Sequence, residues 1–231
     1  MLKLEAVELE QDGFRLWADW QVAAGERVAI IGPSGAGKST LLMALAGFLP
    51  PVAGRIMWQG RDLARVAPGD LPVSMLFQDQ NLFPHLTVAQ NLGLGLEPRL
   101  RLTSAQNNAV EAALDKVGLA GMGARRPAQL SGGQQGRAAL ARALLRARPV
   151  LLLDEPFAAL GPALKSEMLD LLGEVAAETK AAVLIVTHDP SDAQRFADKT
   201  VLVADGVAQP PVETKALFAD PPEALRAYLG Q

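Results

Sequence analysis

The sequence predicts an α/β fold with a parallel sheet, an antiparallel β region at its N-terminus and an inserted helical subdomain. Near-continuous apolar strands alternate with helical segments on both sides of the middle of the chain, which is typical of a parallel sheet covered on both faces. Apolar and polar residues alternate over the first 22 positions, whereas residues 82–126 have helical spacing. We expect one domain of residues 1–231, in which residues 1–81 and 150–231 form the core and residues 82–149 form the helical subdomain.

Length and composition exclude several classes of protein. The 231 residues are 49% hydrophobic and 20% charged, enough for one large domain with a well-formed core. The chain has no cysteine, so disulfides and thiolate metal sites are excluded. Its net charge of -3 does not favour nucleic-acid binding, and we expect no nucleic-acid partner. No apolar run approaches the ~20 residues that span a bilayer, and the N-terminus does not resemble a signal peptide.

The expected elements of the first part follow from their apolar patterns. Strict alternation from Phe14 to Val22 predicts a strand, and looser alternation precedes it in residues 2–9. Residues 27–31 form an apolar run that leads into Gly32. A short apolar helix is expected at residues 41–46, ended by Gly47. Further strands are expected at residues 55–59 and 73–78.

The elements of the second part have clear start signals. Thr103 and Gln106 form the pattern of a capping box before a helix. Residues 150–155 read as a buried strand, and Pro162 suits the first turn of the helix that follows. Residues 182–187 form the next strand, after which Asp189 and Pro190 open a helix. The last expected strand, residues 199–204, ends at an Asp-Gly turn.

The stretch GPSGAGKST carries the clearest chemistry. It matches the phosphate-binding pattern G-x-x-x-x-G-K-[ST], with a strand before it and a helix after it. Its glycines turn backbone N–H groups toward phosphate, its lysine can reach the β and γ phosphates, and its serine can ligate Mg²⁺. The residues expected to hold a nucleotide here are Gly32, Pro33, Ser34, Gly35, Ala36, Gly37, Lys38, Ser39 and Thr40. A P-loop NTPase (nucleoside triphosphatase) core is therefore predicted.

Two acidic residues end the buried strand VLLLDE. Ligands of open α/β sheets bind at the carboxyl ends of strands, so the strand would deliver Asp154 to the nucleotide. Asp154 can hold Mg²⁺ through water, and Glu155 is the candidate to polarise an attacking water. Solvated acids after a strand are common, and this pair is informative mainly because the chain also has a P-loop.

Gln78 and His188 stand at the ends of two further strands. A glutamine in a turn or a lone histidine is by itself more often structural than functional. With the P-loop and the Asp154–Glu155 pair, however, four strands would end in polar groups around one phosphate.

A second glycine-rich stretch, LSGGQ at residues 130–134, completes a family pattern. In the order P-loop, Gln78, LSGGQ, LLLDEP and His188, the motifs resemble those of ATP-binding subunits of ABC transporters. The resemblance implies a head-to-tail homodimer that closes on ATP. Each ATP would lie on one P-loop and be covered by the partner's LSGGQ. The residues expected to reach it across the interface are Ser131, Gly132, Gly133 and Gln134.

The resemblance also implies the roles of the site residues. The activity would be ATP hydrolysis, with ATP and Mg²⁺ as cofactors. Catalytic roles fall on Glu155, His188, Gln78 and Lys38, and the expected metal ligands are Ser39, Gln78 and Asp154.

Several longer stretches narrow the resemblance to the ATPases of bacterial thiamine importers. They are MLKL at the start, residues 73–96, LLLDEPFAALGPALKSEML and VLVADG. The partners implied are integral membrane permease subunits and, indirectly, a periplasmic solute-binding protein. The implied location is the cytoplasmic face of the inner membrane, as a peripheral protein. The transported solute is not chosen by residues of this subunit.

The sequence departs from the family pattern at three places. Gln135 and Gly136 follow the LSGGQ stretch where a basic residue is usual, and Gly136 should weaken the helix start by about 1 kcal/mol relative to alanine. Gly161 stands where a carboxylate is expected. Gln11 occupies the place of an adenine-stacking aromatic, while Phe14 lies on the strand face expected to enter the core.

Other ATPases and kinases share parts of this pattern. A P-loop small-molecule kinase or GTPase would leave LSGGQ unexplained, and no guanine-reading N-K-x-D is present. A DNA-repair ATPase of the same superfamily needs coiled-coil arms, which 231 residues do not allow. An ABC exporter or lipid-release ATPase is the strongest alternative, because only resemblance separates it from an importer.

Overall fold

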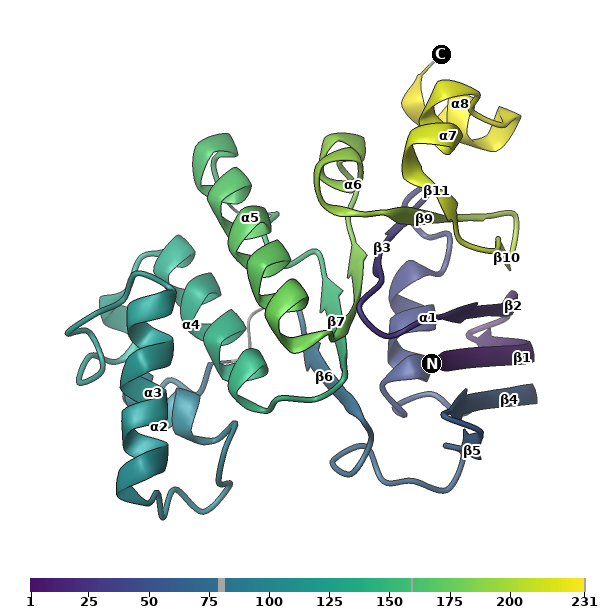
Figure 1. Cartoon of the computed structure of the whole chain (residues 1–231). Coiled ribbons are helices and arrows are strands. Elements are labelled where there is room, and N and C mark those ends of the chain that lie inside the picture. The colour runs from purple at the N-terminus through teal and green to yellow at the C-terminus, as the bar shows by residue number, and fades with distance from the viewer. Residues whose placement is uncertain (79–81, 159, 231) are drawn as a thin grey trace.

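The computed structural model of the chain describes residues 1–78, 82–158 and 160–230 (Figure 1). In this part of the chain, eleven strands form one curled sheet in the order β5-β4-β1-β2-β10-β9-β3-β8-β7-β6, with β11 paired to β9. The strands are β1 (Leu2–Gln11), β2 (Phe14–Val22), β3 (Arg27–Ile31), β4 (Ala53–Trp58), β5 (Arg61–Asp62), β6 (Val73–Leu76), β7 (Val150–Asp154), β8 (Ala182–Val186), β9 (Lys199–Ala204), β10 (Val207–Ala208) and β11 (Val212–Glu213).

The helices cover this sheet and form a group at one side of it. They are α1 (Lys38–Leu45), α2 (Val88–Gly93), α3 (Ser104–Lys116), α4 (Gly132–Leu145), α5 (Pro162–Thr179), α6 (Pro190–Phe196), α7 (Thr214–Ala219) and α8 (Glu223–Leu229), with a single 3-10 turn at Pro127–Gln129. No helix within the described residues is long and apolar enough to cross a membrane.

The parallel part of the sheet is confirmed. Strand β3 pairs in parallel with β8 and β9, and β7 pairs in parallel with β6 and β8. Successive residues of β8 enter two different cores: Leu184 packs with α1 and the antiparallel strands, and Ile185 packs with α5 and α6. Both faces of the strand are therefore buried, which explains its continuous apolar sequence.

The antiparallel region at the N-terminus is confirmed as well. Strand β1 pairs with β2 and β4, and a register shift lies between Leu4 and Val7. Both residues are fully buried although they are three positions apart, because Ala6 takes a positive φ of 45° at the shift. This β-bulge is the reason that apolar residues alternate only loosely in the first strand.

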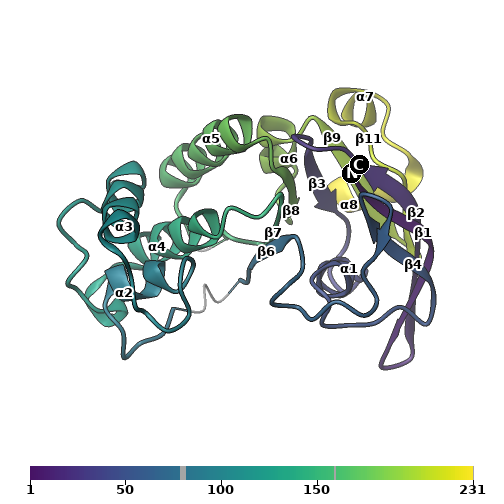
Figure 2. The same cartoon turned by 60° about the horizontal axis from the view of Figure 1, so that its bottom comes forward.

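Helices α2, α3 and α4 share an apolar cluster. Helices α2, α3 and α4 lie together to one side of the sheet in both views (Figures 1 and 2). The cluster includes Val88, Leu92, Leu114 and Ala138, which are fully buried. Helix α4 also contributes Ala139, Leu140 and Ala143 to the cluster on the α5 and α6 face of the sheet, so it joins the helical group to the core.

Most expected element boundaries are within a few residues of the observed ones. The capping box of Thr103 and Gln106 is confirmed, and Pro162 and Pro190 begin α5 and α6. Two further capping boxes begin α2 and α4, at Thr87 and Ser131. The strand expected at residues 73–78 is shorter, since β6 ends at Leu76. Gln78 therefore lies in the turn after the strand.

Candidate functional site

The P-loop connects β3 to α1 at the carboxyl edge of the parallel strands. Its backbone requires glycine where neighbouring groups approach closely. A Cβ on Gly32 would lie 2.0 Å from the carbonyl oxygen of Val203 in β9, and φ of Gly32 is 150°. A Cβ on Gly37 would lie 2.6 Å from Phe14 Cε1, and φ there is 97°. Glycine at these two positions therefore lets the loop pack closely against β9 on one side and against the start of β2 on the other.

Lys38 is the first residue of α1, and its side chain folds back onto the loop. Its Nζ donates to the carbonyl oxygens of Gly32 and Pro33, both at 2.8 Å. The residue is only 8% exposed, and burial lowers the pKa of its amine. The charges of Glu155 and Asp154 act in the opposite direction and favour the charged form. An ammonium group is thus held inside a loop that can receive phosphate.

Ser39 and Asp154 meet beside this lysine. Ser39 Oγ donates to Asp154 Oδ1 at 3.3 Å. Burial raises the pKa of Asp154, and the negative charge of Glu155 raises it further, while Ser39 and Lys38 lower it. A hydroxyl and a carboxylate oxygen suit Mg²⁺, which prefers oxygen ligands and usually keeps several waters. Among the described residues there is no group of three or more His, Cys, Asp or Glu side chains that could hold a metal ion by itself. Phosphate and water would therefore have to complete the coordination of Mg²⁺.

Glu155 lies at the end of β7 in an unusual backbone conformation. Its φ is 43°, in the left-handed region, and its backbone N–H donates to Val186 O of β8 at 3.1 Å. Its carboxylate Oε2 lies 2.9 Å from Nδ1 of His188, which follows β8. Because an ionised carboxylate only accepts, Nδ1 carries the proton in this contact. The sheet therefore places an acid and an imidazole side by side.

A partly buried ion cluster supports the segment that carries His188. Lys165 of α5 contacts Asp189 at 2.7 Å and Asp192 at 2.8 Å. Asp192 also accepts from the hydroxyl of Thr187 at 2.7 Å. The hydrogen bond from Lys165 is the largest cause that lowers the pKa of Asp189, to about 2. These contacts join the start of α5 to both sides of His188, and the sequence patterns did not reveal them.

An open cavity of about 410 Å³ lies over the P-loop. It is lined by Gln11, Asp12, Phe14, Ser34, Gly35, Gly37, Lys38, Ser39, Thr40 and Glu155. Phe14, expected in the core, is half-buried, packing against the core cluster on one side and lining this cavity on the other. It is the first residue of β2 after the Asp12–Gly13 turn, so its ring extends past the sheet to Gly37. The Asp-Gly pattern of this turn was visible in the sequence, and it could have indicated that Phe14 lies at the end of the strand, beside the P-loop.

Gln78 is not brought into this arrangement. Its side chain is exposed, and it is not among the described residues that line the P-loop cavity. Gln78 lies directly before residues 79–81, which are outside the described residues. Its expected catalytic and metal-binding roles therefore remain predictions.

The LSGGQ stretch lies away from the P-loop of the same chain. It begins α4, in the helical group to one side of the sheet, whereas α1 lies inside the curl of the sheet and contacts β1 and β7 (Figures 1 and 2). None of residues 131–134 is among the described residues lining the P-loop cavity. Ser131 and Gln134 bond reciprocally in a capping box, and a Cβ on Gly133 would lie 2.6 Å from Leu164 Cδ2. The first turn of α4 is thus preorganised and packed against α5.

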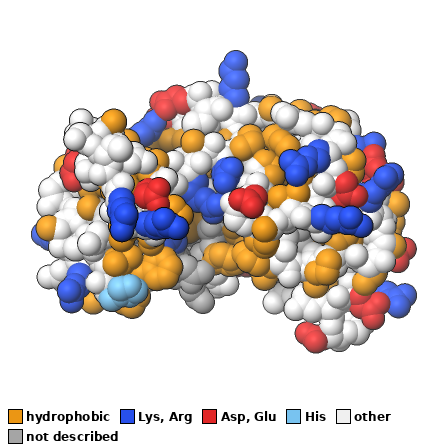
Figure 3. Space-filling model, turned by 90° about the horizontal axis from the view of Figure 1, so that it is seen from below, with side chains coloured by type: hydrophobic (Ala, Val, Ile, Leu, Met, Phe, Trp, Pro, Cys, Tyr) orange, Lys and Arg blue, Asp and Glu red, His pale blue; other side chains and the backbone are white. Residues whose placement is uncertain are grey.

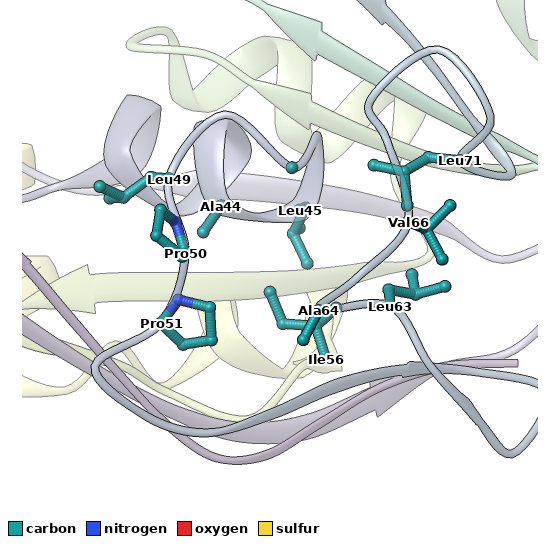
Figure 4. A pocket seen from close by; sticks show the side chains of 11 residues that line it. Ala44, Leu45, Leu49, Pro50, Pro51, Ile56, Leu63, Ala64, Val66 and Leu71 are labelled. Carbon is teal, nitrogen blue, oxygen red and sulfur yellow. The ribbon is translucent and has the colours of Figure 1, made fainter.

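A separate enclosed cavity behind α1 is apolar and does not belong to this site (Figure 4). Its volume is about 60 Å³. Leu45, Ile56, Leu63 and Leu71 are among the side chains that point into it. A space of this size, lined by apolar side chains, does not suit a nucleotide.

Comparisons with known proteins place this geometry in context. The model of the ABC transporter family matches residues 18–158. The thiamine import ATP-binding protein ThiQ of Cereibacter sphaeroides is 67% identical over 230 residues, covering 100% of both chains. ThiQ of Yersinia pestis is 48% identical over 230 residues, covering 100% of this chain and 97% of its own.

Solved structures agree with the fold. The ATP-binding cassette MJ0796, a dimer bound to ADP and Pi, has a TM-score of 0.81 at 29% identity, covering 93% of this chain and 99% of that one. The chain cbiO1 of Clostridium perfringens, part of the ABC transporter complex cbiONQ, has a TM-score of 0.84 at 30% identity, covering 95% and 90%. The expected P-loop NTPase fold is thereby confirmed.

Proposed function

The chain belongs to the ABC transporter family, and we propose that it is the ATP-binding subunit of an importer that takes up thiamine. The observation that carries the proposal is the convergence of Lys38, Ser39, Asp154, Glu155 and His188 at one edge of the parallel sheet. Full-length relatives at 46–67% identity carry names of thiamine import proteins, which favours an importer over an exporter and thiamine over other solutes.

The site residues have distinct roles in this proposal. The P-loop N–H groups and Lys38 bind the β and γ phosphates of ATP. Glu155 orients a water and accepts its proton as the water oxygen bonds to the γ-phosphorus and the bond to the ADP oxygen breaks. His188 donates from Nδ1 to the Glu155 carboxylate and so holds that carboxylate in position for the water.

The Ser39–Asp154 pair fits a magnesium ion that accompanies ATP. Ser39, Asp154 and Gln78 would hold it, with waters and phosphate oxygens. When bound, Mg²⁺ supplies positive charge that neutralises the phosphate oxygens. The raised pKa of Asp154 supports this role, because a carboxylate in need of positive charge lies where the metal would bind.

A homodimer would complete each ATP site. The first turn of α4 presents free backbone N–H groups and the positive end of a helix, yet it lies away from the P-loop of its own chain. A head-to-tail pair would bring Ser131, Gly132, Gly133 and Gln134 of one chain to the γ-phosphate on the other. We divide the chain accordingly into a core of residues 1–81 and 150–231 and a helical subdomain of residues 82–149.

A groove between these two parts suits a membrane permease subunit. It has a volume of about 640 Å³ and is lined by the apolar side chains of Met75, Phe77, Phe83, Leu94 and Leu96 and by the charged side chains of Arg142, Arg146, Arg148 and Asp70, so that its charged lining is mainly positive. Viewed from below, Lys and Arg side chains lie among hydrophobic ones on this side of the molecule (Figure 3). Burial lowers the pKa of Arg142 and Arg146, and the neighbouring arginines lower it further. An apolar segment that carries a carboxylate would complement the apolar lining and the positive charge of Arg146 and Arg148. Docking there would hold the chain at the inner face of the membrane.

Transport assays test the proposal. The chain should be purified with its membrane subunits and solute-binding protein and placed in vesicles. ATP hydrolysis should rise when thiamine is added and stay at the basal rate with an unrelated solute such as an amino acid. Stimulation by a different solute would overturn the thiamine assignment, and absence of ATP hydrolysis would overturn the proposed function itself.

A further inference from the structure

Helix α8 reaches back to the segment that carries His188. Its anchor is Leu225, which is fully buried in the apolar cluster on the α5 and α6 face of the sheet. Tyr228 follows one helical turn later, and its ring packs against the same cluster. The position of Tyr228 is therefore fixed by packing against the core.

The hydroxyl of Tyr228 bonds to the backbone of His188. Its Oη donates to the carbonyl oxygen of His188 at 2.5 Å, across 40 positions of sequence. Burial raises the pKa of Tyr228, and the charges of Asp189 and Glu155 raise it further. The hydroxyl therefore stays protonated, and able to donate, at neutral pH.

This bond restrains the residue whose imidazole meets Glu155. The backbone of a residue has two soft torsions, φ and ψ, and fixing its carbonyl restrains ψ. The direction of the Cα–Cβ bond, and with it the ring, depends on those torsions. The neighbours of His188 are held by the Thr187–Asp192 and Lys165–Asp189 contacts, whereas its own carbonyl is held from α8.

We propose that Tyr228 is a positioning residue for ATP hydrolysis, which holds the His188 backbone so that the imidazole stays on the Glu155 carboxylate. This rests on the proposed function. Among the described residues, Tyr228 touches no group assigned to phosphate or metal, so it acts on the rate of hydrolysis and not on ATP binding. Helix α8 thereby becomes part of the catalytic apparatus.

The Tyr228→Phe variant tests the proposal, because it removes the hydroxyl and keeps the ring that packs. We expect kcat for ATP hydrolysis to fall about 2- to 12-fold, the range for losing one neutral hydrogen bond, with KM for ATP unchanged. Thr179→Val is the matched control, since it removes a hydroxyl that donates to the carbonyl oxygen of Val175 at 2.8 Å, away from the site. That variant should retain the wild-type kcat.

A double-mutant cycle separates positioning from a general loss of stability. In a His188→Ala background there is no imidazole to position, so adding Tyr228→Phe should not lower the residual rate further. An equal fold-change in both backgrounds would overturn the proposal, as would an unchanged kcat in Tyr228→Phe.

A second readout does not depend on ATP hydrolysis. The chain has two histidines, so ¹⁵N-histidine NMR of a His85→Gln protein reports His188 alone. The Nδ1 signal should shift or broaden in Tyr228→Phe and stay unchanged in Thr179→Val. If the wild-type chain did not hydrolyse ATP, the proposed function would fail while this spectrum still tested the contact. An identical spectrum in Tyr228→Phe would show that the hydroxyl does not position the ring.

Discussion

Glu155 Oε2 and His188 Nδ1 lie 2.9 Å apart although the two residues are separated by 33 positions in the chain. They meet because β7 and β8 are parallel neighbours, so their carboxyl ends emerge side by side. Under the proposed function, Glu155 activates the water and His188 orients the Glu155 carboxylate, and the first prediction follows from that division of roles.

Glu155→Gln should bind ATP with Mg²⁺ and accumulate as a closed dimer. Glutamine is nearly isosteric but a poor base, so turnover should fall by about 10²–10⁴-fold. Lys38→Ala is the contrasting variant, with weak ATP binding and no dimer. Size-exclusion chromatography with and without ATP distinguishes them. Near-normal turnover in Glu155→Gln would move the base to His188, and a monomer that still binds ATP would refute the role of LSGGQ.

Phe14→Leu should weaken nucleotide binding about 2- to 12-fold, which corresponds to the 0.5–1.5 kcal/mol of an aromatic pair. The ring lines the P-loop cavity and is available to stack on a base. Since every base has a π-face, GTP should bind to the wild type within about tenfold of ATP. Isothermal titration with ATP, GTP and inorganic triphosphate provides the measurement. The baseless triphosphate should be unaffected by the substitution, and a strong wild-type preference for ATP would mean that another group reads the base.

Gly161→Asp should stabilise the chain and strengthen its ATP-dependent dimer. Gly161 is the N-cap of α5 with extended backbone angles and no capping hydrogen bond, and a Cβ there meets open space. An aspartate can cap the helix and complement its dipole, for about 0.5–1 kcal/mol in the free energy of unfolding. Chemical denaturation and sedimentation with ATP measure the two effects. Gly161→Ala, which adds a Cβ without a cap, should show neither, and a weaker dimer in Gly161→Asp would contradict the expectation.

Lys165→Met should lower the free energy of unfolding at pH 7 by about 1–3 kcal/mol, because Asp192 is nearly buried and would keep only the Thr187 hydroxyl. The pKa of Asp189 is lowered to about 2 in the folded chain from its usual 3.8. The part of the stability that comes from the contact between Lys165 and Asp189 is therefore fully present above about pH 4 and is lost as pH falls through 2. Urea unfolding of both proteins across this range should show their stability difference shrinking in acid. A difference that stays constant with pH would contradict the assignment.

Arg146→Glu should weaken association with the membrane subunits while the ATP hydrolysis of the isolated chain stays unchanged. Arg146 lines the groove between the core and the helical group, and reversing its charge should repel a partner carboxylate. Arg101→Glu, an equal change at an exposed position outside the groove, is the control. Co-purification measures association. Equal losses in both variants would indicate a general effect of charge.

The sequence predicted the core elements well because their signals are local. The run in residues 150–155 has the length and composition of a buried strand. The spacing of Thr103 and Gln106 is that of a capping box, which marks the start of a helix. The two-residue strands β5, β10 and β11 were missed, since two residues show no periodicity. Helix α4 was expected after LSGGQ, but its capping box was overlooked although Ser131 and Gln134 have the required spacing.

The site was predictable as a set of residues and not as a set of contacts. Motifs placed Lys38, Asp154, Glu155 and His188 at strand ends, and parallel topology brings those ends together. Side-chain contacts with residues of distant helices have no sequence motif by which they could be predicted. Lys165 and Tyr228 are ordinary residues in sequence, and their contacts arise only when α5 and α8 pack on the core.

The left-handed backbone conformation of Glu155 creates a conflict between activity and thermostability when this chain is engineered. A non-glycine residue at such a φ costs about 1–2 kcal/mol, and glycine removes that strain while losing part of the gain to its freedom in the unfolded chain. A screen that rewards resistance to heat alone would therefore tend to enrich Glu155→Gly. Such a library would yield robust, well-folded proteins that have discarded the carboxylate assigned to water activation, so heat selection has to be coupled to a readout of turnover.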